Sequence, residues 1–269
     1  MNARTTEAEA RLAIAARLSR EAGRLALEHW TRCEVLWKPD DSMVTEADLA
    51  IQASLTAGIE AAFPEDGVLG EETAVACPRR LGADHVWVID PVDGTDNFGR
   101  GLPGFCVSVG VLRFGRPLCG AVYDPVVDHL FTGLIGRGAC LKGRPLRVTP
   151  MERSRRSLFS IRSPLPADVS PAVRGWLERF RLRRVGPTAL HLCYVGMGAL
   201  AWVHDHHASL WDLAGAAPVL LEAGGVMTAP DGSPLFPIDP DGYAGEPIGF
   251  LAGDPQAHDE CRRELAAGE

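Results

Sequence analysis

WVIDPVDGTDNF, at residues 87–98, is the stretch around which the rest of the chain is expected to fold. Its apolar start is mostly β-branched or aromatic and predicts a buried strand. We expect this strand to end at Asp90, because Pro91 fixes φ and has no N–H group for strand pairing. Asp93 then brings a second carboxylate to the same place, ahead of a short helix or turn.

Acidic side chains and free N–H groups at one place predict a site shared by a cation and an anion. A divalent cation between Asp90 and Asp93, with a phosphate on the backbone N–H groups of Gly94 and Thr95, satisfies both halves. The alternative is an ordinary Asp-Gly turn after a strand, which the dipeptide alone favours. The longer pattern Asp-Pro-x-Asp-Gly-Thr favours the ion site.

The composition places the chain among ordinary globular proteins. Its 269 residues are 46% hydrophobic and 23% charged, enough for one large domain or two that share a core. The net charge of −8 argues against nucleic-acid binding, which depends on Lys and Arg at phosphates, but not against an anionic substrate held by metal ions. No apolar run predicts a membrane span or a signal peptide. Seven scattered cysteines without a C-x-x-C pair predict reduced thiols in a cytoplasmic protein.

Three further acidic positions have both a structural and a functional interpretation. Asp48 lies three residues after Thr45, and Asp212 lies three residues after Ser209, which is the spacing of a helix capping box. Glu71-Glu72 follows an apolar strand, where adjacent side chains face opposite sides and only one easily reaches a shared site. From these segments alone, capping and solvated surface pairs explain the acids as well as catalysis does.

Periodicity and breakers predict the remaining elements. Helices are expected over residues 8–31, 45–63, 170–180, 188–200, 209–222 and from 254 onward. Strands are expected over residues 105–112 and 120–125 as a hairpin, and near 130–132, 139–141 and 157–161. Pro218 is expected to bend the helix at 209–222 or to lie in its first turns. The basic, turn-rich residues 144–156 are expected to connect two halves.

One histidine cluster spans residues 204–207. His204 and His206 alternate around Asp205, so both would lie on one face of a strand, where a zinc pair is an option. No third ligand stands at an obvious spacing, which favours an exposed strand end or loop.

Four motifs in the expected order resemble the inositol monophosphatase family. Residues 87–100 and 211–225 resemble its two signature segments, and residues 45–48 and 70–72 match two further motifs at similar spacing. The resemblance covers the chain from the first helix to about residue 253. It implies the layered αβαβα sandwich of the sugar phosphatases, an α/β fold. Residues 1–145 would form an N-terminal α+β subdomain with most metal ligands, and residues 146–269 a C-terminal α/β subdomain.

The same resemblance implies an enzyme, a phosphoric monoester hydrolase that uses two or three Mg²⁺ ions per site. The implied ligands are the side chains of Glu71, Asp90, Asp93 and Asp212 and the carbonyl of Val92. Oxygen ligands of this kind suit Mg²⁺. The chemistry is consistent, because phosphate-monoester hydrolysis is very slow without neutralisation of the phosphoryl charge.

The implied nucleophile is a metal-bound water, oriented and deprotonated by Thr95 and Asp48 with Glu71 nearby. In that arrangement Asp48 accepts a hydrogen bond from the Thr95 hydroxyl, while the N–H groups of Gly94 and Thr95 bind phosphate. No covalent phosphoenzyme is expected, because no Cys, His or Ser motif indicates a nucleophile. Lithium sensitivity and a homodimer are expectations from the family alone.

The implied substrate contacts are Asp93, Gly186, Pro187, Thr188 and Asp205. Asp205 stands where relatives commonly have a longer acid that contacts sugar hydroxyls. Pro187 lacks a backbone donor, and Thr188 adds bulk.

The expected substrate is therefore a small polyol or sugar phosphate, with myo-inositol 1-phosphate as the default. Histidinol phosphate, fructose 1,6-bisphosphate and a nucleotide 3′-phosphate are alternatives within the family, and neither nucleic acid nor membrane is an expected partner. A regulatory scaffold that retains the fold is an alternative of another class. The complete acidic set argues against it, because buried carboxylates without a cation are costly.

Overall fold

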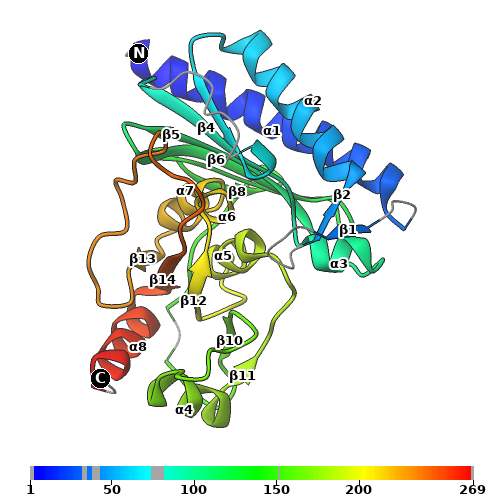
Figure 1. Ribbon diagram of the computed structural model, residues 1–269. Helices are drawn as coiled ribbons and strands as arrows, with labels where there is room; N and C mark the ends of the chain where they lie inside the picture. The colour runs from blue at the N-terminus through cyan, green and yellow to red at the C-terminus, as the bar shows by residue number, and fades with distance from the viewer. Residues whose placement is uncertain (1–2, 32–34, 38–42, 74–81, 151, 268–269) are drawn as a thin grey trace.

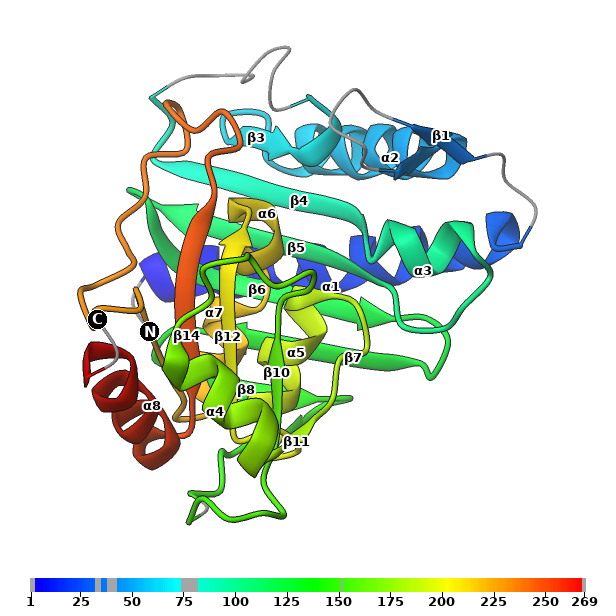
Figure 2. The ribbon, with the colours of Figure 1, turned by 60° about the horizontal axis from the view of Figure 1, so that its bottom comes forward.

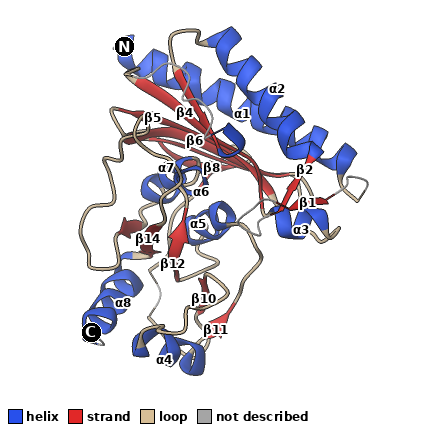
Figure 3. Cartoon of the chain, viewed as in Figure 1, coloured by secondary structure: helices blue, strands red, loops and turns tan. Residues whose placement is uncertain are grey.

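Helices and sheets alternate in layers through the molecule (Figures 1 and 3). The computed structural model describes residues 3–31, 35–37, 43–73, 82–150 and 152–267. In these residues two helices cover one sheet, three short helices separate it from a second sheet, and two helices cover the far side of that sheet. The expected layered αβαβα sandwich is therefore confirmed.

The larger sheet has seven strands among the described residues. Its order is β3 (Gly67–Gly70), β4 (His85–Asp93), β5 (Cys106–Arg113), β6 (Arg116–Asp124), β7 (His129–Leu134), β8 (Gly138–Leu141) and β9 (Arg144–Pro145). β3 and β4 are parallel, and each later pair of neighbours is antiparallel. The expected hairpin is β5 and β6. A separate antiparallel pair consists of β1 (Val35–Trp37) and β2 (Met43–Thr45).

The smaller sheet belongs to the second half of the chain. Its order in the described residues is β11 (Arg181–Leu182), β10 (Leu158–Ile161), β12 (Trp202–Ala208), β14 (Ile248–Gly253) and β13 (Val226–Thr228). β10 is parallel to both β11 and β12, whereas β14 is antiparallel to β12 and β13. The first sheet ends at Pro145 and the second begins at Leu158, on either side of the expected connection; the division into two subdomains stays a prediction.

The helices fill the other layers, as Figure 2 shows from a second direction. The outer pair on the larger sheet is α1 (Ala3–His29) and α2 (Glu46–Ala62). The middle layer holds α5 (Thr188–Gly196), α6 (Leu210–Ala214) and α7 (Ala217–Glu222). The outer pair on the smaller sheet is α4 (Pro171–Arg179) and α8 (Pro255–Ala267). Two short pieces, η1 (Glu71–Thr73) and α3 (Thr95–Gly99), follow β3 and β4.

The predicted helix over 209–222 is instead two helices. α6 ends at Ala214 and α7 begins at Ala217, with Pro218 in the first turn of α7, where its missing N–H is harmless. Glu71 and Glu72 lie in η1 and not on the strand itself.

Side chains of β4 alternate between two cores. Trp87 and Ile89 belong to the core under α1 and α2, whereas Val86 and Val88 belong to the core that contains α6. Asp90 is next on the second face. The pleat of the strand therefore points the first acid of the motif toward α6.

A row of glycines lets the middle helices lie directly on the sheet. Gly110, Gly120 and Gly133 are neighbours across β5, β6 and β7. A Cβ atom on any of them would collide with the backbone between Ala214 and Val219. Only glycine permits this close approach, which sets the position of α6 relative to β4.

The described residues bear on two expectations, one about membrane spans and one about the cysteines. No helix of the described residues is long and apolar enough to cross a membrane. Cys106, Cys119, Cys140, Cys193 and Cys261 are free thiols, and the other two cysteines, Cys33 and Cys77, lie outside the described residues.

Candidate active site

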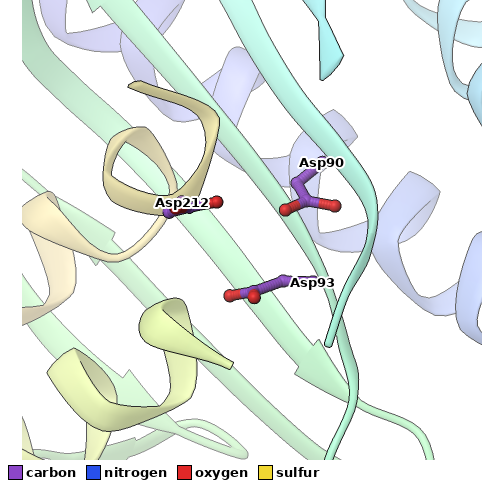
Figure 4. Close-up of side chains that lie close together, drawn as sticks. All are labelled: Asp90, Asp93 and Asp212. Atoms are coloured by element: carbon purple, nitrogen blue, oxygen red, sulfur yellow. The ribbon is translucent and has the colours of Figure 1, made fainter. Parts of the chain in front are cut away.

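A β-bulge at the end of β4 decides where the two aspartates of the central motif point. Asp90 pairs with Ser108 of β5, and Asp93 pairs with Cys106. The two residues between the aspartates therefore lie opposite a single residue of β5. Side chains alternate along a strand, so without this extra residue the two aspartates would face opposite sides. The bulge turns both carboxylates toward α6 (Figure 4).

This bulge also corrects the expectation that the strand ends at Asp90. β4 continues through Pro91 to Asp93. A bulge leaves a residue outside the ladder of strand hydrogen bonds, so the missing N–H of Pro91 does not stop the strand.

Asp212 reaches the same space from the opposite side. One carboxylate oxygen from each of Asp90, Asp93 and Asp212 lies within 4.8 Å of the others (Figure 4). Asp212 is also the N3 residue of a capping box, since its Oδ2 accepts the N–H of Ser209 at 2.8 Å. The capping prediction is confirmed, and the same side chain joins the acidic cluster. Within the described residues, the ligand atoms of this trio lie close enough together to hold a metal ion, and the histidines of residues 204–207 form no such group.

The three acids resist ionisation together. Burial, followed by the charges of Glu71, Asp93 and Asp212, raises the pKa of Asp90 well above its ordinary value. Burial raises the pKa of Asp93 to about 7, although the N–H of Ala189 donates to its Oδ2 at 2.8 Å and lowers the pKa. Burial and the charge of Asp93 raise the pKa of Asp212. Oxygen donors that repel one another when ionised are a suitable environment for a hard divalent cation.

Glu71 stands beside this trio. It lies in η1, directly after β3, and is partly buried. Its negative charge raises the pKa of both Asp90 and Asp93, which places it in the electrostatic neighbourhood of the cluster. The register of β3 and β4 explains the proximity, because Gly70 pairs with Ile89, one residue before Asp90.

Asp48 is buried and only half satisfied. Its Oδ2 accepts the N–H of Thr45 at 2.8 Å and also the Thr45 hydroxyl, so the predicted capping box is present. Its Oδ1 is buried and has no hydrogen-bond partner among the residues that the structure describes. Burial raises the pKa of this carboxyl group. An unpartnered buried oxygen indicates a missing polar ligand or an ion, so the cap does not exhaust what Asp48 can do.

The segment after the bulge forms the N-terminus of α3. Gly94 is its N-cap, with φ +98°, a left-handed conformation that favours glycine. The first N–H groups of a helix have no acceptor within the helix, which leaves those of the predicted phosphate site available to an anion. The Thr95 hydroxyl donates to the carbonyl of Val92 at 3.0 Å.

The hydrogen bond expected between Thr95 and Asp48 is therefore not formed between these two described residues. A hydroxyl in the first turn of a helix readily bonds a carbonyl a few residues away, and here that local partner is Val92.

The comparisons with known proteins agree with this geometry. The model of the inositol monophosphatase family matches residues 7–266. The chain belongs to the inositol monophosphatase family. Its membership makes it a phosphoric monoester hydrolase of a family that depends on metal ions, and the acidic trio is its candidate metal centre.

Individual relatives cover most of the chain. Over 242 residues it is 36% identical to inositol monophosphatase 1 of Solanum lycopersicum, which spans 86% of this chain and 88% of the relative. Over 236 residues it is 35% identical to Nus factor SuhB of Pseudomonas aeruginosa, with 84% and 87% covered. The crystal structure of the extragenic suppressor protein suhB from Bartonella henselae superimposes with a TM-score of 0.84 at 26% identity, over 96% of this chain and 98% of that one.

In this family member, the N-terminus of α5 forms another wall of the site. Pro187 is the N-cap of α5, and a Cβ atom on Gly94 would lie 2.9 Å from its Cγ. Gly186, with φ +119°, precedes it. The Thr188 hydroxyl donates to Asp205 at 3.2 Å. The structure thus brings the expected substrate contacts Gly186, Pro187 and Thr188 beside Gly94, which belongs to the predicted phosphate site, and beside Asp93.

Sequence reasoning missed three residues of this wall. Asn97 donates through Nδ2 to the carbonyls of Gly104 and Val185, which ties α3 to the segment before α5. The N–H of Ala189 holds Asp93, and the guanidinium of Arg162 lies 3.8 Å from Asp205. Arg162 had a usable signal, because it directly follows a predicted strand, where functional side chains of α/β proteins gather. The other two depend on long-range packing.

Proposed function

We propose that this protein hydrolyses a small polyol or sugar phosphate monoester in a Mg²⁺-dependent reaction, with myo-inositol 1-phosphate as the reference substrate. The observation that carries the proposal is the convergence of Asp90, Asp93 and Asp212, from two distant segments, so that one carboxylate oxygen of each lies within 4.8 Å of the others. Such a cluster is unfavourable by itself and becomes favourable with a bound cation.

The residues that would hold Mg²⁺ are this trio, Glu71 and the carbonyl of Val92, and we propose two or three ions per site. The carbonyl can serve both an ion and the Thr95 hydroxyl, because a carbonyl oxygen has two lone pairs. When bound, Mg²⁺ neutralises charge on the phosphoryl oxygens and lowers the pKa of water.

The protein groups would supply orientation and proton transfer. The N–H groups of Gly94 and Thr95 would hold the phosphate at the start of α3. The free Oδ1 of Asp48 is a base without a partner, and a raised pKa suits a group that accepts a proton near neutral pH. The Thr95 hydroxyl, already fixed by Val92, would orient the attacking water.

The test is phosphate release from myo-inositol 1-phosphate with Mg²⁺ and with a chelator. The Asp93→Asn variant keeps the shape of the side chain and an acceptor for Ala189, but removes the charge. Asp259→Asn, on the exposed face of α8, is the matched control for the same chemical change. We expect the Asp93 variant to lose at least about 100-fold in rate, the order seen when a charge-stabilising group is removed. Release that is equal in both variants, or that survives chelation, refutes the proposal.

A regulatory scaffold is a second candidate, favoured by the relative named Nus factor SuhB. Equal phosphate release with and without Mg²⁺ would support it. Within the enzyme interpretation, histidinol phosphate, fructose 1,6-bisphosphate and a nucleotide 3′-phosphate belong in the same assay panel. Lithium inhibition, a homodimer and a cytoplasmic location stay predictions.

A further inference from the structure

Asp205 is committed to the protein and not to the substrate side. Its side chain is only 5% exposed. Oδ1 accepts the N–H of His207 at 2.8 Å, and Oδ2 accepts the Thr188 hydroxyl at 3.2 Å. A carboxylate with both oxygens bonded and little exposed surface is a poor acceptor for a sugar hydroxyl. The short acid at this position therefore changes what the leaving-group side of the site offers.

Arg162 is the exposed group in front of this carboxylate. Its backbone N–H donates to the carbonyl of His204 at 3.2 Å, which fixes it at the end of β10 beside β12. Its Nη1 lies 3.8 Å from Asp205 Oδ2, and its side chain is 35% exposed. A separation of 3.8 Å is too long for a hydrogen bond, and a guanidinium has five N–H donors. Arg162 therefore keeps donors free for another anion.

Arg162 adjoins the reaction site. Its partner Asp205 is bonded by Thr188, and the next residue, Ala189, holds Asp93. Asp205 is thus linked to Asp93 of the candidate metal centre through the Thr188 hydroxyl and the N–H of Ala189. Its charge also reaches that centre, since it opposes the effect of burial on the pKa of both Asp93 and Asp212.

A second guanidinium strengthens the positive field. Arg184 Nη2 donates to the carbonyl of Ser163, the residue after Arg162, at 3.0 Å. Burial and then the charge of Arg162 lower the pKa of Arg184, as expected for neighbouring cations. The charges of Asp205 and then Asp96 partly balance Arg184, and Asp96 lies on exposed α3 surface.

We propose that Arg162, supported by Arg184, selects phosphate monoesters whose leaving group has a second anionic group, such as a sugar bisphosphate. This inference rests on the proposed phosphatase function and names its substrate class. A guanidinium binds a phosphate or carboxylate through two parallel, charge-assisted hydrogen bonds, whereas the hydroxyl groups of a polyol are neutral and cannot form such a pair. A leaving group with an ammonium is repelled. We expect kcat/KM to be highest for fructose 1,6-bisphosphate, lower for myo-inositol 1-phosphate and lowest for histidinol phosphate.

The experiment measures kcat/KM with Mg²⁺ for these three substrates. The variants are Arg162→Gln and Arg162→Lys, and the control is Arg116→Gln at the far end of the β5–β6 hairpin. Cys106 pairs with Asp93 at the site end of β5, whereas Arg116 pairs with Arg113 at its other end. Seven residues of strand separate them, about 23 Å.

We expect the ratio of kcat/KM for the bisphosphate to that for myo-inositol 1-phosphate to fall about ten-fold in Arg162→Gln, the loss of one contact worth about 1.4 kcal/mol. The ratio of kcat/KM for histidinol phosphate to that for myo-inositol 1-phosphate should rise in the same variant. In Arg162→Lys the bisphosphate ratio should fall less than in Arg162→Gln, and in Arg116→Gln neither ratio should change. A variant that folds poorly lowers all rates together and leaves ratios of rates unchanged, so misfolding cannot mimic the result.

Two failures are distinguishable. If release stays Mg²⁺-dependent but both ratios are unchanged in Arg162→Gln, or the wild type prefers histidinol phosphate, the substrate-class inference is wrong and the phosphatase function stands. If none of the three substrates, nor p-nitrophenyl phosphate, releases phosphate with Mg²⁺, both proposals are wrong.

Discussion

The buried acids make the cation-free protein sensitive to pH in a direction that the structure fixes. Burial raises the pKa of Asp93 from 3.8 to about 7. Between those values the folded chain keeps a proton that the unfolded chain has lost, so the free energy of unfolding falls as the pH rises. At about 1.4 kcal/mol per pH unit, ionising Asp93 in the folded protein costs about 4 kcal/mol. The pKa values of Asp90 and Asp212 are raised as well and act in the same direction.

A buried histidine works in the opposite direction and determines the design of the assay. Burial, with the charge of Arg184, lowers the pKa of His191 to about 3, so the folded chain resists protonation of this ring. This contribution to stability grows as the pH rises from about 3 to 6.5 and can hide the effect of the acids in a simple pH curve. The difference between wild type and Asp93→Asn cancels it, because His191 is common to both.

The measurement is therefore chemical and thermal unfolding of these two proteins from pH 4 to pH 8, in EDTA and in Mg²⁺. In EDTA we expect the free energy of unfolding of Asp93→Asn, relative to that of the wild type, to rise by about 4 kcal/mol between pH 4 and pH 8, which is roughly 10 °C in Tm. With Mg²⁺ the wild type should recover, because a ligand that binds only the folded state stabilises it. A difference that stays flat with pH in EDTA would mean that Asp93 ionises as freely as an exposed acid, and the reasoning about the cluster would fail.

Two other predictions separate roles that share one residue. Asp48→Asn keeps an oxygen for the capping hydrogen bond but removes the base. We expect kcat to fall at least about 100-fold, while the free energy of unfolding changes by about 1 kcal/mol or less. An unchanged kcat in a rate assay would mean that Asp48 serves only the capping box. Gly94→Ala places a Cβ atom 2.9 Å from the Gly104 carbonyl and from Pro187, whereas Gly136→Ala, also at positive φ, meets nothing within 4 Å. Both should lose about 1 kcal/mol from backbone strain in denaturant unfolding, and only the Gly94 variant should also lose phosphatase activity; equal effects on activity would contradict the proposed phosphate site.

The sequence predicted the acids of the site better than their arrangement. Asp90 and Asp93 were recognisable because two carboxylates flank a proline that follows an apolar strand segment. Asp48 and Asp212 were visible as the acids of capping boxes, and both are the N3 residues of such boxes in the structure. The choice between cap and ligand could not be made locally, because a capping box uses one carboxylate oxygen and leaves the other to whatever long-range packing brings near.

Other features depend on contacts that no local pattern encodes. Pro91 indicated the end of a strand, yet the opposing strand β5 accommodates it in a bulge. Asp205 was expected to contact the substrate, which stays a prediction, and the hydrogen bonds of its oxygens with Thr188 and His207 had no signal in the sequence. That outcome requires the start of α5 to lie against β12, two elements that only the tertiary fold brings together.

The site is assembled from two sides, and each side depends on residues without chemistry of their own. From the sheet, the extra residue of the bulge returns Asp93 to the face where Asp90 already points. From the middle layer, Asp212 approaches only as far as α6 can sink onto β5. Gly110 allows this, since a side chain there would displace the backbone of Ala214, two residues after Asp212. In the proposed site the carboxylates could not compensate for a shift of an ångström or more, because Mg²⁺ demands a nearly ideal octahedral geometry. The glycine row and the bulge are therefore as necessary to the proposed metal site as its ligands.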